Sequence, residues 1–156
     1  MKRFILPIAL VVLCGCAHEP KMAKVAGLWP GEFTPDVSDR NATKEKHFRG
    51  YLQLYLTDDK FKMEMNSPQQ GFTVQGKWKV SDGQVEIHGD TFAFDNPTEE
   101  DQKTFGMKLI SPEEIRATFN RGLVFKASPD RKVLAGLKTS FGSILGTFRF
   151  ERPLPQ

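Results

Sequence analysis

Two cysteines two positions apart, Cys14 and Cys16, are the only thiols in the 156-residue chain. A thiol is the side chain that can be acylated, joined in a disulfide or bound to a soft metal ion. The three histidines are scattered at His18, His47 and His88, and no grouping of histidines with carboxylates has metal-ligand spacing. We therefore expect chemistry at the cysteines, and neither a metal nor an organic cofactor.

A second candidate for metal chemistry is the run Met63-Glu64-Met65, whose thioether sulfurs are soft donors of the kind that bind Cu(I). Both methionines share the apolar face of one segment with Phe61, so we interpret them as core residues. The chain contains no Gly-x-Ser-x-Gly motif and no glycine-rich phosphate loop. Because the sequence holds no catalytic constellation, we expect a protein that is not an enzyme.

The two cysteines follow a segment typical of an exported protein. Lys2 and Arg3 supply positive charge, residues 4–13 are apolar, and small Gly15 precedes Cys16. This order predicts a secretory signal peptide. The apolar run is about half the ~20 residues that a membrane-spanning helix needs, so we expect no transmembrane anchor here.

Residues 13–16, Leu-Cys-Gly-Cys, resemble the lipobox of bacterial lipoproteins. The resemblance implies cleavage after Gly15, a diacylglyceryl group on the sulfur of Cys16, and further fatty acid such as palmitate on the new N-terminus. Two or more acyl chains anchor a protein stably. Ala17 follows the acylated position, and by the sorting pattern of Gram-negative lipoproteins this implies anchoring to the outer membrane, with either the periplasmic or the outer face left open.

We expect residues 1–15 to be the signal peptide, residues 16–25 a lipidated tether, and residues 26–153 a single domain. Removing residues 1–15 leaves 141 residues, an ordinary size for one domain. It also reduces the 22 basic residues to 20, against 19 acidic ones. A net charge near +1 gives no basis for a nucleic-acid partner. With Cys16 acylated, the mature chain would have no free thiol.

The elements of the domain are predicted by alternation of apolar and polar residues, which is clearest in residues 72–80. Short segments at intervals of 8–12 residues indicate nine or ten antiparallel strands in hairpin order. Apolar residues change from odd to even positions at Gly89-Asp90, which predicts a β-bulge or a tight bend. We favour a closed up-and-down β-barrel over a β-sandwich, because closure removes exposed sheet edges. The expected strands include residues 105–110, 115–119 and 133–139, with turns at 58–59, 81–83 and 111–114.

The first strand opens Gly27-Leu28-Trp29, which resembles the Gly-x-Trp opening of lipocalins and of lipocalin-like bacterial lipoproteins. The resemblance implies that Trp29 closes one end of the barrel. It also implies that an arginine near the end of the last strand, Arg149 or Arg152, packs over the tryptophan. A cation–π contact of this kind contributes about 0.5–2 kcal/mol. Pro30 departs from the family pattern and restricts the pairing of this strand.

Two functions fit a barrel of this kind. The first is binding of a small apolar or amphipathic ligand in the interior, which suits large apolar inward-facing side chains. The second is contact with another envelope protein through the outer face or through loops 34–49 and 95–104, around a filled core. The tether spans at most ~27 Å, so we expect the Trp29 end near the membrane and an open mouth facing away. The residues expected to line the cavity are Phe61, Met63, Met65, Phe72, Trp78, Phe92, Phe94 and Phe148.

Overall fold

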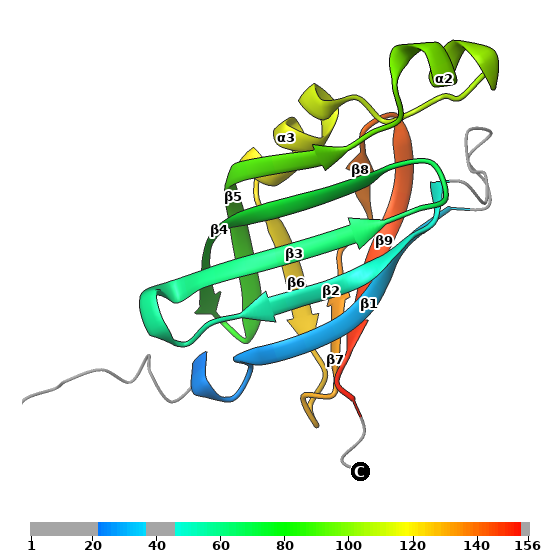
Figure 1. The fold of residues 1–156 in the computed structure, drawn as a ribbon. Helices are drawn as coiled ribbons and strands as arrows, with labels where there is room; N and C mark the ends of the chain where they lie inside the picture. The colour runs from blue at the N-terminus through cyan, green and yellow to red at the C-terminus, as the bar shows by residue number, and fades with distance from the viewer. Residues whose placement is uncertain (1–21, 37–45, 154–156) are drawn as a thin grey trace, which may run out of the picture.

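A computed structural model describes residues 22–36 and 46–153 of the chain. The expected signal peptide with its cleavage residue Gly15, the expected lipidation site Cys16, and the first part of the expected tether lie outside these residues. The described part is built from nine strands, two α-helices and a short 3₁₀ helix, η2 (Figure 1). The strands are β1 (Gly27–Pro35), β2 (Phe48–Leu54), β3 (Lys60–Asn66), β4 (Gly71–Ser81), β5 (Gln84–Asp95), β6 (Leu123–Ala127), β7 (Val133–Gly136), β8 (Thr139–Phe141) and β9 (Ile144–Glu151), and the helices are η2 (Thr57–Asp59), α2 (Glu99–Thr104) and α3 (Pro112–Asn120).

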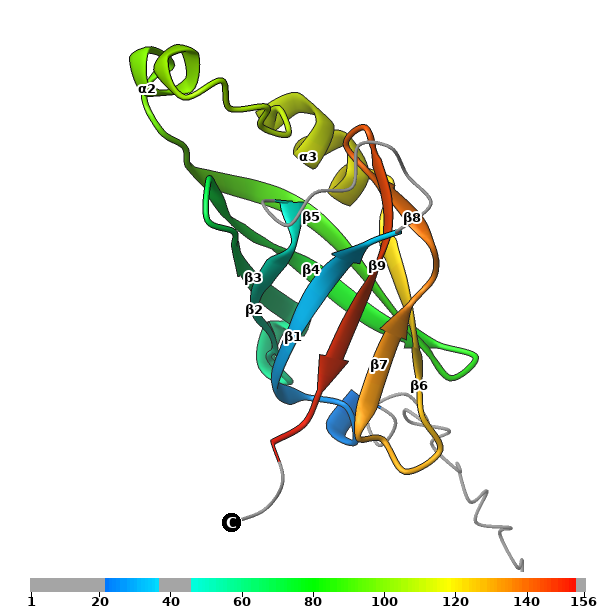
Figure 2. The same ribbon diagram turned by 90° about the vertical axis from the view of Figure 1, so that its right-hand side faces the viewer.

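The strands form one closed sheet. Each strand from β1 to β6 pairs antiparallel with the next strand along the chain, and β7 pairs with β9. The sheet closes because β1 also pairs with β9, with Gly31 opposite Phe150 and Pro35 opposite Gly146. This is an antiparallel eight-stranded barrel with one extra strand, β8. Figure 2 shows β1, β9 and β7 side by side at the closure. The barrel expected from the sequence is confirmed, in place of the sandwich.

The extra strand is a continuation of β7 along the same edge of β9. Ala135 lies opposite Arg149, and Thr139 lies opposite Gly146. From the first of these pairs to the second, the β7–β8 segment advances four residues while β9 advances three. The segment therefore has one extra residue, as in a β-bulge. The segment expected to be one strand over residues 133–139 is thus interrupted between β7 and β8.

A second irregularity interrupts β5 where the sequence indicates one. Gln75 lies opposite Thr91, but Gly76 lies opposite Gly89, so Asp90 is the unpaired residue of a bulge. A Cβ atom on Gly89 would lie 2.6 Å from Val74 Cγ1 and 3.0 Å from Phe119 Cβ. The glycine is needed because α3 packs closely against β5 at this point.

Two of the expected strands, residues 105–110 and 115–119, are wrong. Residues 115–119 belong to α3, which begins with Ser111 as N-cap and Pro112 in its first turn. The Ser111 hydroxyl accepts a hydrogen bond from Glu114 N–H at 3.2 Å, and the Glu114 carboxylate accepts one from Ser111 N–H at 2.9 Å. This reciprocal capping box begins a helix, and proline fits the first turn because no partner for its nitrogen is needed there.

Residues 105–110 form an irregular connection between α2 and α3. Ile110 lies in no strand, yet its backbone is satisfied by a side chain: its N–H donates to Gln70 Oε1 at 2.8 Å, and its carbonyl accepts from Gln70 Nε2 at 3.1 Å. One buried glutamine therefore supplies both bonds that a neighbouring strand would provide, which is why the segment stays attached to the barrel without strand pairing.

Candidate functional site

The Trp29 end of the barrel is closed. Trp29 is fully buried, and its indole Nε1–H donates to the carbonyl of Val25 at 2.8 Å. The guanidinium carbon of Arg152 lies 4.5 Å from the centre of the tryptophan ring. The same guanidinium donates to the carbonyl of Lys24 at 2.8 Å and to that of Ala26 at 3.2 Å. One arginine thus covers the tryptophan and fixes the segment that leads into β1.

The two arginines expected at this position have different partners. Arg152 contacts Trp29, whereas Arg149 lies on the outer face and pairs with Glu151 of its own strand at 2.7 Å. Gly27 precedes the tryptophan with a φ of 125°, in the region that favours glycine. The glycine of the Gly-x-Trp pattern therefore has a local reason, because the first residue of β1 adopts a positive φ that other residues rarely adopt.

Most of the residues expected to line a cavity belong to a buried core in which aromatic rings from several elements contact one another. Phe33 and Phe148 have ring centroids 4.8 Å apart, and those of Phe72 and Phe141 are 5.3 Å apart. Phe48 lies 5.5 Å from both Phe72 and Phe141. Centroids at these separations are in direct contact, which leaves no room for a ligand between the rings. Six of the eight expected lining residues are at most 3% exposed: Phe61, Met63, Met65, Phe72, Trp78 and Phe148.

The end of the barrel away from Trp29 is covered by α3 (Figure 1). Phe119 of this helix is fully buried, and its ring lies 5.9 Å from that of Phe72 and 6.3 Å from that of Phe148. The other two expected lining residues, Phe92 and Phe94, are partly exposed and stack at 6.4 Å, with the guanidinium of Arg116 4.9 Å from the Phe94 ring. The helix thus packs where an open mouth was expected.

A small polar cluster lies on the outer face of β2 and β3. The Tyr51 hydroxyl donates to Glu64 at 2.8 Å, and Lys62 Nζ lies 3.2 Å from the same carboxylate. The hydrogen bond from Tyr51, followed by that from Lys62, lowers the pKa of Glu64 below its ordinary value of 4.5. Contacts with Tyr51 and Glu64 raise the pKa of Lys62. These contacts stabilise the charged forms of Glu64 and Lys62.

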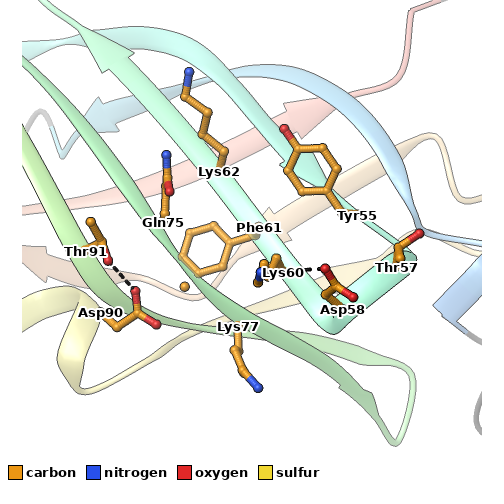
Figure 3. Close-up of a pocket in the computed structure, with 11 residues that line it drawn as sticks. Tyr55, Thr57, Asp58, Lys60, Phe61, Lys62, Gln75, Lys77, Asp90 and Thr91 are labelled. Carbon is orange, nitrogen blue, oxygen red and sulfur yellow. Dashed lines mark hydrogen bonds and ion pairs between the residues drawn. The ribbon is translucent and has the colours of Figure 1, made fainter.

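A hollow of about 570 Å³ lies on the outer face of β3, β4 and β5 (Figure 3). It contains three lysines, Lys60, Lys62 and Lys77, and two aspartates, Asp58 and Asp90. Figure 3 shows the lysines around the hollow, with Tyr55 at one side and Thr91 at the other. No sequence motif marks this hollow, because it is created by strand pairing between residues far apart in the chain.

A second hollow, of about 520 Å³, crosses β2, β1 and β9. Its centre is Glu32, which pairs in register with Arg49 on one side and Arg149 on the other. One carboxylate oxygen of Glu32 lies 3.0 Å from His47 Nε2, within hydrogen-bond distance. The same oxygen lies 3.6 Å from Arg49 Nε. The charges of this hollow are therefore largely paired among themselves.

Within residues 22–36 and 46–153, no group of three or more His, Cys, Asp or Glu residues is arranged to hold a metal ion. None of the helices in these same ranges is long and apolar enough to cross a bilayer. The fold and the site define a closed β-barrel with a tryptophan–arginine closure at one end and a helix over the other. No family model, curated protein or solved structure matches the chain.

Proposed function

We propose that the protein is a lipoprotein of the cell envelope, anchored through Cys16, whose filled barrel is a non-enzymatic platform for contact with another envelope protein. The role as a platform is supported by the packing of the barrel interior, where aromatic rings contact one another at centroid distances of 4.8–5.5 Å. A barrel whose inward side chains contact one another presents only its outer face and its connecting segments to partners.

The support for the anchor comes from the sequence. Residues 13–16 resemble a lipobox, and Ala17 after the cysteine favours the outer membrane of a Gram-negative bacterium. The described chain begins at Met22, close to the Trp29 end, so the anchor would join the barrel at its closed end. A lipid on Cys16 would then leave the α2 end directed away from the membrane.

The α2 end offers the surface best suited to a protein partner. No residue of α2 is buried, and its first turn carries Glu99, Glu100 and Asp101. Phe105, which follows the helix, is 68% exposed. In Figure 1 this helix projects from the barrel at the end opposite the segment that begins at Met22. An exposed aromatic residue beside acidic ones matches a partner with a basic surface around an apolar depression. Loop 34–49 was the other expected contact, and its residues 37–45 lie outside the described ones.

The anchor is tested by growing cells with an alkyne analogue of palmitate and measuring incorporation into the protein. Wild type should be labelled and should sediment with membranes, and Cys16→Ala should lose both properties. Cys14→Ala is the matched control, because Cys14 would be removed with the signal peptide, and it should stay labelled. Equal labelling of wild type and Cys16→Ala would refute lipidation at Cys16.

The platform is tested with a photo-cross-linking amino acid placed at Phe105 in native membranes. We expect one discrete adduct that is absent when the amino acid replaces Leu137, which is 51% exposed on the barrel wall. The other candidate function, an apolar ligand inside the barrel, predicts a different result. If Phe105 gave no adduct and native mass spectrometry of the purified protein found a bound lipid or other apolar molecule, the ligand hypothesis would replace the platform.

A further inference from the structure

The segment that links the expected anchor to the barrel is held against the barrel. Met22 and Val25 are buried, and the carbonyls of Lys24, Val25 and Ala26 accept hydrogen bonds from Arg152 or Trp29. Five residues, 17–21, lie between Cys16 and Met22 in the sequence, and the six steps from one to the other span at most about 20 Å when extended. A chain lipidated at Cys16 would therefore keep this end of the barrel within reach of the lipid headgroups.

Three large apolar side chains are exposed near this end. Leu28 is 48% exposed, Tyr55 45% and Leu56 50%. Leu28 lies opposite Gln53, and Gln53 lies opposite Lys62, so this apolar residue and the lysine belong to one row across β1, β2 and β3. Tyr55 N–H donates to the carbonyl of Lys60, which places the tyrosine beside the hollow. Apolar and cationic side chains are therefore neighbours on this wall.

The hollow holds like charges on adjacent strands. Lys60 lies directly opposite Lys77. Like charges at directly paired positions destabilise a sheet unless a counter-charge lies between them. Lys60 has only a solvent-exposed contact of 3.6 Å with Asp58, and in the described part of the chain Lys77 makes no ion pair. Lys62 is paired with Glu64 at 3.2 Å, and Asp58 and Asp90 also line the hollow, so the charge left for an anion is that of Lys77 and, in part, that of Lys60.

We propose that a tether-end patch, consisting of Leu28, Tyr55, Leu56, Lys60, Lys62 and Lys77, docks on the bilayer that holds the anchor. Lipid phosphate occupies the lysine-lined hollow, and the apolar side chains enter the interfacial layer. Tyrosine, leucine and lysine together are the composition that binds membrane interfaces, and an acidic protein would give no role to the exposed leucines. The proposal rests on the proposed lipid anchor and adds a fixed orientation of the barrel on the membrane.

The test uses the purified acylated protein in vesicles of phosphatidylethanolamine with or without phosphatidylglycerol. Acylation blocks the Cys16 sulfur, so a fluorophore attaches only to an introduced cysteine, at Leu56→Cys or, as the control, at Phe105→Cys. We expect the label at position 56 to shift to shorter wavelength and to be quenched by spin-labelled lipid, and the label at position 105 to do neither. Identical spectra at the two positions would overturn the proposal.

The charge arm compares two double variants in the Leu56→Cys background. Lys60→Gln with Lys77→Gln should lower the ratio of docked to undocked label in anionic vesicles about fivefold per lysine removed. Lys103→Gln with Lys108→Gln removes the same charge elsewhere and should change nothing. If both pairs act equally, or if inorganic phosphate abolishes the shift while the lipid composition has no effect, the hollow does not bind lipid.

Flotation of the vesicles in a density gradient separates this proposal from the proposed anchor. A chain that floats with an unshifted label at position 56 overturns the docked orientation and leaves the anchor intact. A chain that does not float overturns both, because the orientation depends on the anchor.

Discussion

Arg152 covers the closed end of the barrel and also holds the segment before β1. Its guanidinium lies on the ring of Trp29 and donates hydrogen bonds to the carbonyls of Lys24 and Ala26. Arg152→Ala should lower the free energy of unfolding by about 2 kcal/mol, from the lost cation–π contact and the charged hydrogen bonds. Arg149→Ala, which removes only an exposed pair with Glu151, should cost less than about 0.5 kcal/mol. Urea denaturation checks both values, and equal losses would show that Arg152 has no special role.

Glu64 gives a prediction of pH dependence at the same scale. Hydrogen bonds from Tyr51 and Lys62 lower the pKa of Glu64 in the folded state. A depressed pKa stabilises the fold at pH values above the ordinary 4.5, and this contribution is lost as the pH falls through the folded value. The carboxylate is partly exposed, so the contribution is below about 1 kcal/mol.

Wild type should therefore lose stability more steeply than Glu64→Gln as the pH is lowered from about 5. Tyr51→Phe removes the hydrogen bond that lowers the pKa of Glu64 most, so this variant should also lose stability less steeply than wild type as the pH falls. Denaturation midpoints measured across this range test the idea, and parallel curves for wild type and Glu64→Gln would contradict it.

At the scale of elements, α3 shows why one part of the fold was mispredicted. Ile115, Ala117 and Phe119 alternate as in a strand, while Ile115, Thr118 and Phe119 share a helix face. Five residues are too few for periodicity to separate the two interpretations. The capping box and the proline before them were the deciding signal, and they were interpreted as a turn. Longer alternating segments such as residues 72–80 were predicted correctly, and so was an irregularity at Gly89-Asp90, which the structure shows to be a bulge.

The role of α3 as a cover is testable with a matched pair of phenylalanines. Phe119→Ala should lower the free energy of unfolding by about 3–5 kcal/mol, because it leaves a cavity among the rings of Phe72, Phe141 and Phe148. Phe105→Ala changes an exposed ring and should cost less than about 0.5 kcal/mol. The cavity should also bind benzene, detected by chemical-shift changes, where wild type does not. A Phe119→Ala protein as stable as wild type would show that α3 does not seal the core.

For the whole molecule, sequence reasoning identified side chains that point into the barrel, but it did not show whether they fill the interior or leave a cavity. Alternation places Phe72 and Trp78 on one face, but the volume left between opposing walls depends on the curvature of a closed barrel. The hollow was missed for a related reason. Lys60 and Lys77 are opposite each other only because of the β3–β4 register. Contacts across the barrel require the register of every strand, and single-sequence periodicity does not supply it.

Closure of the barrel between β1 and β9 is the longest-range feature of the fold, and Gly31 is where it can be tested. A Cβ atom on Gly31 would lie 2.2 Å from the carbonyl oxygen of Arg149 and 2.7 Å from the Cα of Phe150. Both atoms belong to the backbone of β9, so neither can move aside as a flexible side chain would. Gly31→Ala should therefore separate the strands and lower the free energy of unfolding by about 3 kcal/mol.

The control for closure is Thr34→Ala, an exposed position of the same strand, which should stay within about 0.5 kcal/mol of wild type. Thermal denaturation followed by circular dichroism measures both variants. Amide exchange adds a local readout, because Gly31→Ala should accelerate exchange in β1 and β9 more than in β3 and β4. Selective acceleration is expected because the β1–β9 seam joins the first and the last strand of the barrel and can open by itself. Uniform acceleration across all strands would mean that the barrel opens as one unit and that this seam is no weaker than the rest.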